Sequence, residues 1–249
     1  MQSGRQRRRV ALRDRLPVGD LVPSRTPPVA AGILVALVAA AFLLGRWTLT
    51  PPEFGRLAAR WGVVPADPGL AGWFTGWLLH RGWLHVLAAV LPLWVLGRAL
   101  EDRLGHARFL VFFAACATLA AAVAALADPR DRVPLIGASG AAGGVLGGHL
   151  RLFPGGRVAV AWPLPGLARV AEVPTGLAAV IWLLTQLIVA APGAALGPGR
   201  TVVWSAVAGL LAGAALAGRF RHPERDHPDW WDTLAGPGAA ASAGRADPA

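Results

Sequence analysis

The chain has 249 residues, of which 55% are hydrophobic and only 15% charged, so its composition excludes an ordinary soluble domain and favours a helical membrane protein. Its net charge is +10, and all 24 of its basic residues are arginines. These are scattered over short loops and one tail, which argues against a nucleic-acid surface. The single cysteine, Cys116, excludes an internal disulfide and a thiolate metal site.

Six apolar segments are candidates for membrane-spanning helices, because a span needs about 20 predominantly apolar residues. They cover residues 29–48, 81–98, 107–127, 136–153, 174–192 and 201–219. The sequence therefore predicts an all-α, polytopic membrane protein built as a bundle of six transmembrane helices. Its membrane domain is predicted to cover residues 29–220.

The distribution of arginines predicts the direction in which the chain crosses the membrane. A basic tail, residues 1–28, precedes the first span, and the positive-inside rule keeps such a tail in the cytoplasm. If the first span runs outward, 17 of the 24 arginines fall on the inner side and seven on the outer side. Both termini are therefore predicted to be cytoplasmic. A cleaved signal peptide is the rival interpretation of the first span.

Two segments outside the spans differ from the rest in composition. Residues 50–80 are rich in Trp, Phe and Leu and carry little charge, which predicts an outer loop that lies in the membrane interface. Residues 221–249 are rich in Pro, Gly, Ala and charge, which predicts a disordered cytoplasmic tail.

The fourth span contains the run LIGASGAAGGVLGG, residues 135–148, in which Ser139 carries the only hydroxyl. Gly140, Gly144 and Gly148 recur every four residues, so one side of this helix is bare enough for close approach of another backbone. Ser139 is predicted about one turn inside the outer end of the span. It is either one more small residue between packed helices or a nucleophile.

Two histidines, His80 and His85 in the stretch HRGWLH, are predicted at the outer end of the second span, near the level of Ser139. Ionisable residues inside a membrane are candidates for function, although a hydrogen-bonded interfacial histidine is the structural alternative. His149 lies about 15 Å along the helix from Ser139, too far to accept its proton. No third ligand accompanies His80 and His85, so zinc is a poor explanation and we expect no metal or cofactor.

The order of these motifs along the chain resembles that of the rhomboid family of intramembrane serine proteases, over about residues 71–219. The similarity begins with HRGWLHVLAAVLPLWVLG, continues through GRALEDRLG and is most specific at GASGAAGGVLGG. AGLLAG, residues 208–213, fits the family's Gly-x-x-x-Gly in the sixth helix. The resemblance implies that Ser139 occupies the nucleophile position and that His85 helps to form the oxyanion hole. We expect five glycines to serve helix packing: Gly137, Gly140, Gly144, Gly209 and Gly213.

The chain departs from the family pattern at two positions. Ala89 stands where the family has an asparagine four residues after the second histidine, and Ala206 stands at the position of the catalytic histidine. A serine hydroxyl is a weak nucleophile without a base within about 3 Å, and the chain has no lysine to serve instead. The sequence therefore predicts a pseudoprotease that recognises transmembrane segments of client proteins within the lipid bilayer. The expected location is a bacterial plasma membrane, and no nucleic acid is expected as a partner.

The alternative is an active intramembrane serine endopeptidase that uses Ser139 with a surrogate base. His85 and His80 are predicted at a suitable depth for that role. Asp128 and Asp131, in the outer loop before the fourth span, are weaker candidates. A histidine that serves as the base no longer serves as the oxyanion donor in the same geometry. A membrane protein with a purely scaffolding role is a third possibility.

Overall fold

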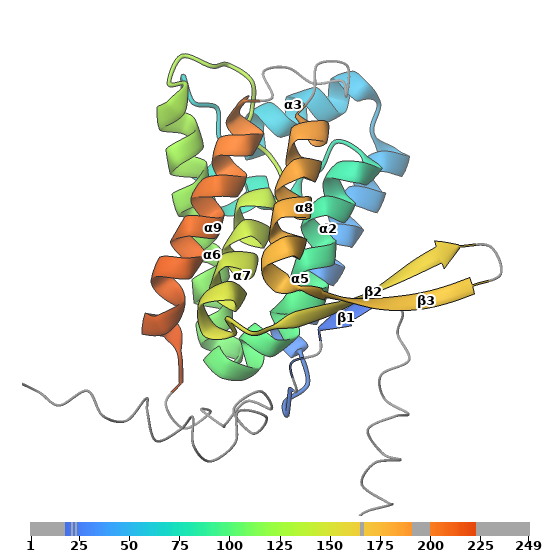
Figure 1. Ribbon diagram of the computed structural model, residues 1–249. Helices are drawn as coiled ribbons and strands as arrows, with labels where there is room; N and C mark the ends of the chain where they lie inside the picture. Colours follow the sequence, from blue (N-terminus) through green and yellow to red (C-terminus); the bar gives the residue numbers. More distant parts are fainter. Residues whose placement is uncertain (1–17, 21, 23, 165–166, 191–199, 223–249) are drawn as a thin grey trace, which may run out of the picture.

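The computed structural model describes residues 18–20, 22, 24–164, 167–190 and 200–222. Within these ranges a bundle of helices falls on the six apolar segments, so the chain is a mostly helical, polytopic membrane protein (Figure 1). The bundle helices are α2 (Val29–Thr48), α5 (Trp83–Leu104), α6 (His106–Ala127), α7 (Ser139–Leu152), α8 (Thr175–Val189) and α9 (Arg200–Phe220). Most of the tail predicted at 221–249, and the first part of the tail predicted at 1–28, lie outside the described residues.

Helix α7 is short and central. Four of the bundle helices, α2, α5, α6 and α9, are long and apolar enough to cross a membrane. The 14 residues of α7 extend about 21 Å, less than the roughly 30 Å of a hydrocarbon core. Figure 1 shows α7 beginning about midway along its longer neighbours, after a loop that descends into the bundle. Ser139 is therefore the first helical residue and does not lie one turn inside the helix.

Glycines let α7 touch its neighbours backbone to backbone. A Cβ atom on Gly209 would lie 1.9 Å from the carbonyl oxygen of Gly140, and one on Gly213 would lie 1.9 Å from that of Gly144. On the side that faces α6, a Cβ on Gly144 would lie 2.4 Å from the Cβ of Cys116. These distances are too short for any side chain, so α7 is held between α6 and α9 only because its contact positions are glycine.

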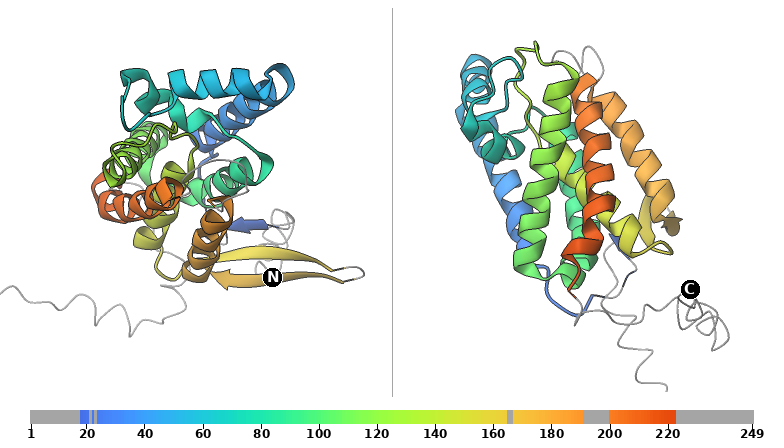
Figure 2. Two further views of the ribbon diagram at one scale, coloured as in Figure 1. Left: turned by 90° about the horizontal axis from the view of Figure 1, so that it is seen from above. Right: turned by 90° about the vertical axis from the view of Figure 1, so that its left-hand side faces the viewer.

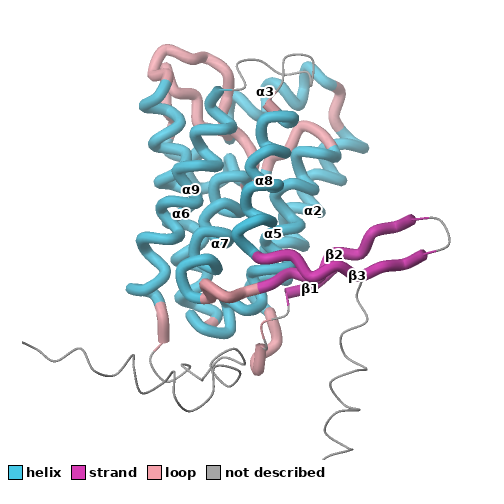
Figure 3. The backbone as a smooth tube through the Cα atoms, viewed as in Figure 1, coloured by secondary structure: helices cyan, strands magenta, loops and turns pink. Residues whose placement is uncertain are grey.

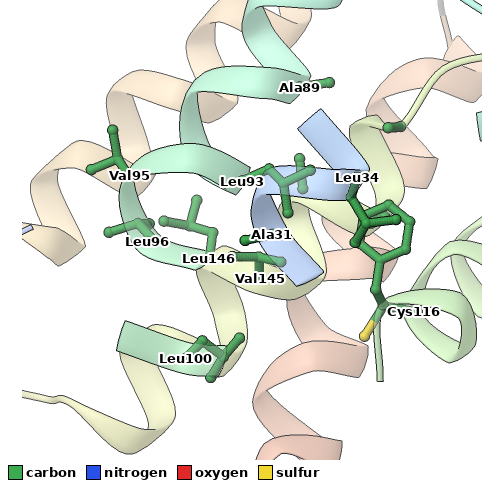
Figure 4. Close-up of a cluster of buried hydrophobic side chains, with 14 of the residues drawn as sticks. Ala31, Leu34, Ala89, Leu93, Val95, Leu96, Leu100, Cys116, Val145 and Leu146 are labelled. Atoms are coloured by element: carbon green, nitrogen blue, oxygen red, sulfur yellow. The ribbon is translucent and has the colours of Figure 1, made fainter. Parts of the chain in front are cut away.

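The apolar core lies where α2, α5, α6 and α7 meet, with side chains from all four helices in one cluster (Figure 4). Ala89 and Ala206 both belong to this cluster, and their exposed fractions are 1% and 0%. At both positions where the chain departs from the family pattern, the structure therefore has a fully packed methyl group.

The N-terminus of α2 is capped by Glu101, a residue of α5 that lies about 70 residues further along the chain. Pro28, at the N-cap position, makes no side-chain cap. The buried carboxylate of Glu101 instead accepts hydrogen bonds from the backbone N–H groups of Ala30 (2.8 Å) and Ala31 (2.7 Å). Glu101 also contacts His106 at the start of α6. The sequence GRALEDRLG thus joins the starts of α2 and α6 to the end of α5.

The outer segment at 50–80 is partly helical. It contains α3 (Pro51–Trp61), α4 (Leu70–Thr75) and the 3-10 helix η1 (Gly76–Leu78). Thr50 and Glu53 form a capping box at the start of α3, which explains why that helix begins there. Figures 1 and 2 show α3 lying across one end of the bundle, an orientation typical of an interfacial helix.

A small antiparallel sheet lies at the opposite end of the bundle from α3 (Figure 3). Its strand order is β1 (Val18–Asp20), β2 (Arg157–Leu164) and β3 (Leu167–Pro174). No strand was predicted here from the sequence, and the hairpin occupies the inner loop between the fourth and fifth spans. Strand β1 and the last residues of α9 lie at this same end, as six crossings require.

Trp182 fastens α8 to α5 at a point that a proline creates. Pro92 lies inside α5 and has no N–H, so the carbonyl of Ala88 lacks its helical partner. The indole Nε1–H of Trp182 donates to that carbonyl oxygen at 2.6 Å. A side chain from α8 thereby satisfies a buried acceptor that α5 cannot satisfy itself.

Replacing Trp182 with phenylalanine should lower the free energy of unfolding by about 1–3 kcal/mol, because the Ala88 carbonyl then stays buried without a donor. The loss should shrink in a Pro92→Ala background, where residue 92 offers its own N–H to that carbonyl. Reversible denaturation in detergent micelles measures the four stabilities of this double-mutant cycle. An equal loss in both backgrounds would show that the indole contributes only packing.

Candidate functional site

A cavity of about 370 Å³ opens near the α3 end of the bundle. Its walls come from the segment before α5, the first turn of α5, one side of α6, the loop before α7, the first turns of α7 and α9, and the end of α8. Most of the lining is apolar and aromatic, which is typical of a ligand site. The polar side chains among the described lining residues are Arg81, His85, Ser139, Thr201 and Ser205, together with the indoles of Trp73, Trp77 and Trp83.

Ser139 lines this cavity and is buried, with an exposed fraction of 3%. Because it is the first residue of α7, the backbone N–H groups of the first helical turn have no carbonyl partner within the helix. The helix dipole adds partial positive charge at the same point. The hydroxyl therefore stands beside an array of backbone donors, which is the chemistry of an oxyanion hole.

His80 is fixed by two hydrogen bonds and supports the loop before α7. Its Nε2 accepts a hydrogen bond from the backbone N–H of Ala138 at 3.2 Å. Its Nδ1 must then carry the proton, and it donates to the carbonyl oxygen of Leu78 at 3.2 Å. His80 is therefore a neutral imidazole with both nitrogens engaged, which removes it as a base for Ser139 in this structure.

His85 lies against the same loop but has an unused nitrogen. Its ring centroid is 4.8 Å from that of His80, and its Nε2 is buried with no hydrogen-bond partner among the described residues. Gly137 has a φ of 107° and lies before α7, and a Cβ there would be 2.3 Å from the His85 Nε2. The structure thus places Gly137 against the histidine ring and not between helices.

The first turn of α7 is level with Ser205 and Ala206 on α9. A Cβ on Gly140 would lie 2.8 Å from the Ser205 hydroxyl oxygen, and a Cβ on Gly143 would lie 2.6 Å from the Ala206 carbonyl oxygen. Residue 206 therefore stands at the depth of Ser139, but its methyl group can neither accept nor donate a proton. Ala89 follows His85 by one helical turn, and its side chain, like that of Ala206, is a methyl group.

Acidic side chains stay outside the lining. Asp128 follows the last residue of α6, and the Oδ1 of Asp131 accepts a hydrogen bond from the backbone N–H of Val133 at 2.9 Å. Among the described residues, no carboxylate lines the cavity. The two aspartates are thereby part of the loop before α7 and do not reach the cavity wall.

Three polar residues that line the cavity were not identified as site residues from the sequence. Thr201 and Ser205 are four residues apart on α9 and share one helix face, a spacing that could have revealed them. Arg81 lies between the two histidines in HRGWLH, and its Nη2 donates to the carbonyl oxygen of Pro134 at 3.3 Å. A charged residue next to two buried histidines was the available signal.

A comparison with protein families gives a match for the sequence. The family model of the Rhomboid domain matches residues 68–222, a range that extends from the segment before α4 to the end of α9 and contains Ser139, His85, Ala89 and Ala206. No curated protein matches the chain.

Proposed function

Since the chain belongs to the rhomboid family, we propose that it is a pseudoprotease, a membrane protein that recognises transmembrane segments of client proteins without cutting them. The cavity would hold an unwound or polar portion of the client next to the backbone donors of α7. The proposal places the protein in a bacterial plasma membrane with both termini in the cytoplasm. The excess of arginines on the predicted inner side supports this orientation.

The observation that carries the proposal is the apolar side chain at residue 206. The backbone donors are present, but the position from which the family's base acts holds a packed methyl group. Attack on a peptide carbonyl needs a group that accepts the serine proton, and loss of the base typically costs several powers of ten in turnover. Binding of a client segment requires no proton acceptor, so the cavity and its backbone donors are sufficient for recognition.

The rival proposal, proteolysis with a surrogate base, rests on His85. This histidine lines the cavity together with Ser139, and its Nε2 is unused. That same lack of a partner weighs against the proposal, since a working base would be hydrogen-bonded to the serine hydroxyl. His80 is further from the role because both of its nitrogens are engaged.

Purified protein should show no Ser139-dependent labelling by a fluorophosphonate, because no group accepts the proton of the hydroxyl. The measurement compares gel fluorescence of the native protein with that of Ser139→Ala. Strong labelling that disappears in Ser139→Ala would reject the pseudoprotease proposal. If that labelling also disappeared in His85→Ala, the endopeptidase with His85 as its base would replace it.

A further inference from the structure

The lining of the cavity contains hydrogen-bond donors and one positive charge. The first turn of α7 contributes backbone N–H groups and the positive end of its helix dipole. His85 contributes an Nε2 atom that is buried and has no partner among the described residues. Arg81 contributes the only formal positive charge in the described lining, in which no carboxylate occurs.

A buried donor array of this kind fits an anion. Helix N-termini bind carboxylates and phosphates because their N–H groups and dipole both favour negative charge. The unused nitrogen of His85 is a second, separate observation, since buried polar side-chain atoms are normally hydrogen-bonded. Arginine favours carboxylates in particular, because its planar fork matches their two oxygens.

We infer that the cavity binds a carboxylate, carried as an Asp or Glu side chain near the outer end of the client's transmembrane segment. Arg81 pairs with the carboxylate, while the α7 N-terminus and His85 donate to its oxygens. The inference rests on the proposed function and adds to it the group by which a client is recognised. Unlike peptide cleavage, it needs no proton acceptor, so Ala206 and Ala89 do not weaken it.

The charge of Arg81 is shared with the wall of the cavity. Its guanidinium donates to the Pro134 carbonyl, and the carboxylate of Asp131 is close enough to act on it electrostatically. Asp131 itself lies outside the described lining. These contacts hold the guanidinium at the loop before α7, and a client carboxylate would approach it from the cavity side.

The test uses the full chain in phosphatidylcholine nanodiscs, so that no lipid carboxylate competes. The probes are two fluorescent peptides, each a single Leu/Ala transmembrane helix with lysine flanks and an amidated C-terminus. One peptide carries a Glu four residues inside its outer end, and the other carries a Gln at that position. Fluorescence anisotropy measures the Kd of each peptide for the native protein and for three variants, Arg81→Gln, Arg81→Lys and Arg130→Gln.

The native protein should bind the Glu peptide about 10- to 100-fold more tightly than the Gln peptide, as expected for a charge-assisted hydrogen bond. Arg81→Gln should remove this difference without changing the Kd of the Gln peptide, and Arg81→Lys should retain part of it. Arg130, an exposed arginine in the loop before α7, is the control, and Arg130→Gln should leave both values unchanged.

Three results would overturn the inference. Equal binding of both peptides by the native protein would leave client recognition intact and remove the carboxylate site. Equal weakening of both peptides by Arg81→Gln would show that the arginine only shapes the cavity. Failure of both peptides to bind would reject the carboxylate site and the proposed function together.

Discussion

Replacing Ala206 with histidine should create fluorophosphonate labelling that depends on Ser139. A Cβ atom on a helix is tilted toward the helix N-terminus, and the residues that precede Ala206 on that side, Thr201 and Ser205, line the cavity. Residue 206 is also level with the first turn of α7. An imidazole there should enter beside the Ser139 hydroxyl and accept its proton.

Adding Ala89→Asn to Ala206→His should raise turnover of a transmembrane substrate by about 10- to 1000-fold, since loss of one oxyanion donor typically costs about 100- to 1000-fold. Ala89 lies one turn beyond His85, so an amide there would supplement the donors around the cavity. Ala89→Asn alone should do little, because oxyanion stabilisation has no effect before the nucleophile is activated. Cleavage of a membrane-anchored test substrate measures turnover, and Ser139→Ala in the double variant is its control.

Both alanines are packed in the apolar core, so the new side chains carry a stability cost of about 1–3 kcal/mol each. Thermal unfolding in detergent must therefore accompany the activity measurement. A well-folded double variant that stays unlabelled would show that the histidine does not reach Ser139. The assignment of Ser139 and His85 to rhomboid site positions would then lose its support.

Gly144→Leu should abolish folding or lower the free energy of unfolding by at least about 3 kcal/mol, whereas Ser139→Ala should change it by less than about 1 kcal/mol. A Cβ on Gly144 would lie 2.4 Å from the Cβ of Cys116, and the Gly144 carbonyl already touches Gly213 on α9. Neither neighbouring helix can give way without separating from α7. Ser139→Ala removes only a hydroxyl that lines the cavity.

Gly218→Leu is the matched control for this prediction, since Gly218 lies on α9 with nothing within 4 Å of its Cβ position. That variant should fold, because it adds a side chain only to open space. Unfolding midpoints and yields of monodisperse protein in detergent give the comparison. Comparable losses for Gly144→Leu and Ser139→Ala would reveal a structural role of the serine hydroxyl.

Hydrophobicity predicted the six bundle helices because span length and apolar composition are properties of each segment alone. The start of α7 is different. Residues 136–138 are as apolar as the helix that follows, yet Ala138 gives its N–H to His80 and Gly137 adopts a positive φ against His85. Contacts between distant segments therefore decide where α7 begins, and no local sequence pattern encodes these contacts.

Other features were missed for the same reason. Strand β1 pairs with β2 across about 140 residues, so its three residues have no recognisable strand pattern of their own. The hairpin of β2 and β3 contains prolines and connects two apolar spans, which favoured a loop interpretation. Arg81 was overlooked because cavity lining depends on how the segment before α5 meets the loop before α7.

The remote cap on α2 has a consequence for how the chain is made. The backbone N–H groups of Ala30 and Ala31 donate to a carboxylate that lies about 70 residues further along the chain. Ribosomes add about 5–20 residues per second. For roughly 4–14 s of synthesis, the first transmembrane helix therefore has an incomplete N-terminus, whose N–H groups depend on water or lipid headgroups. Only when the corner between α5 and α6 has reached the same membrane face can Glu101 complete the cap of α2, so the final state of the first helix depends on a helix that is made after it.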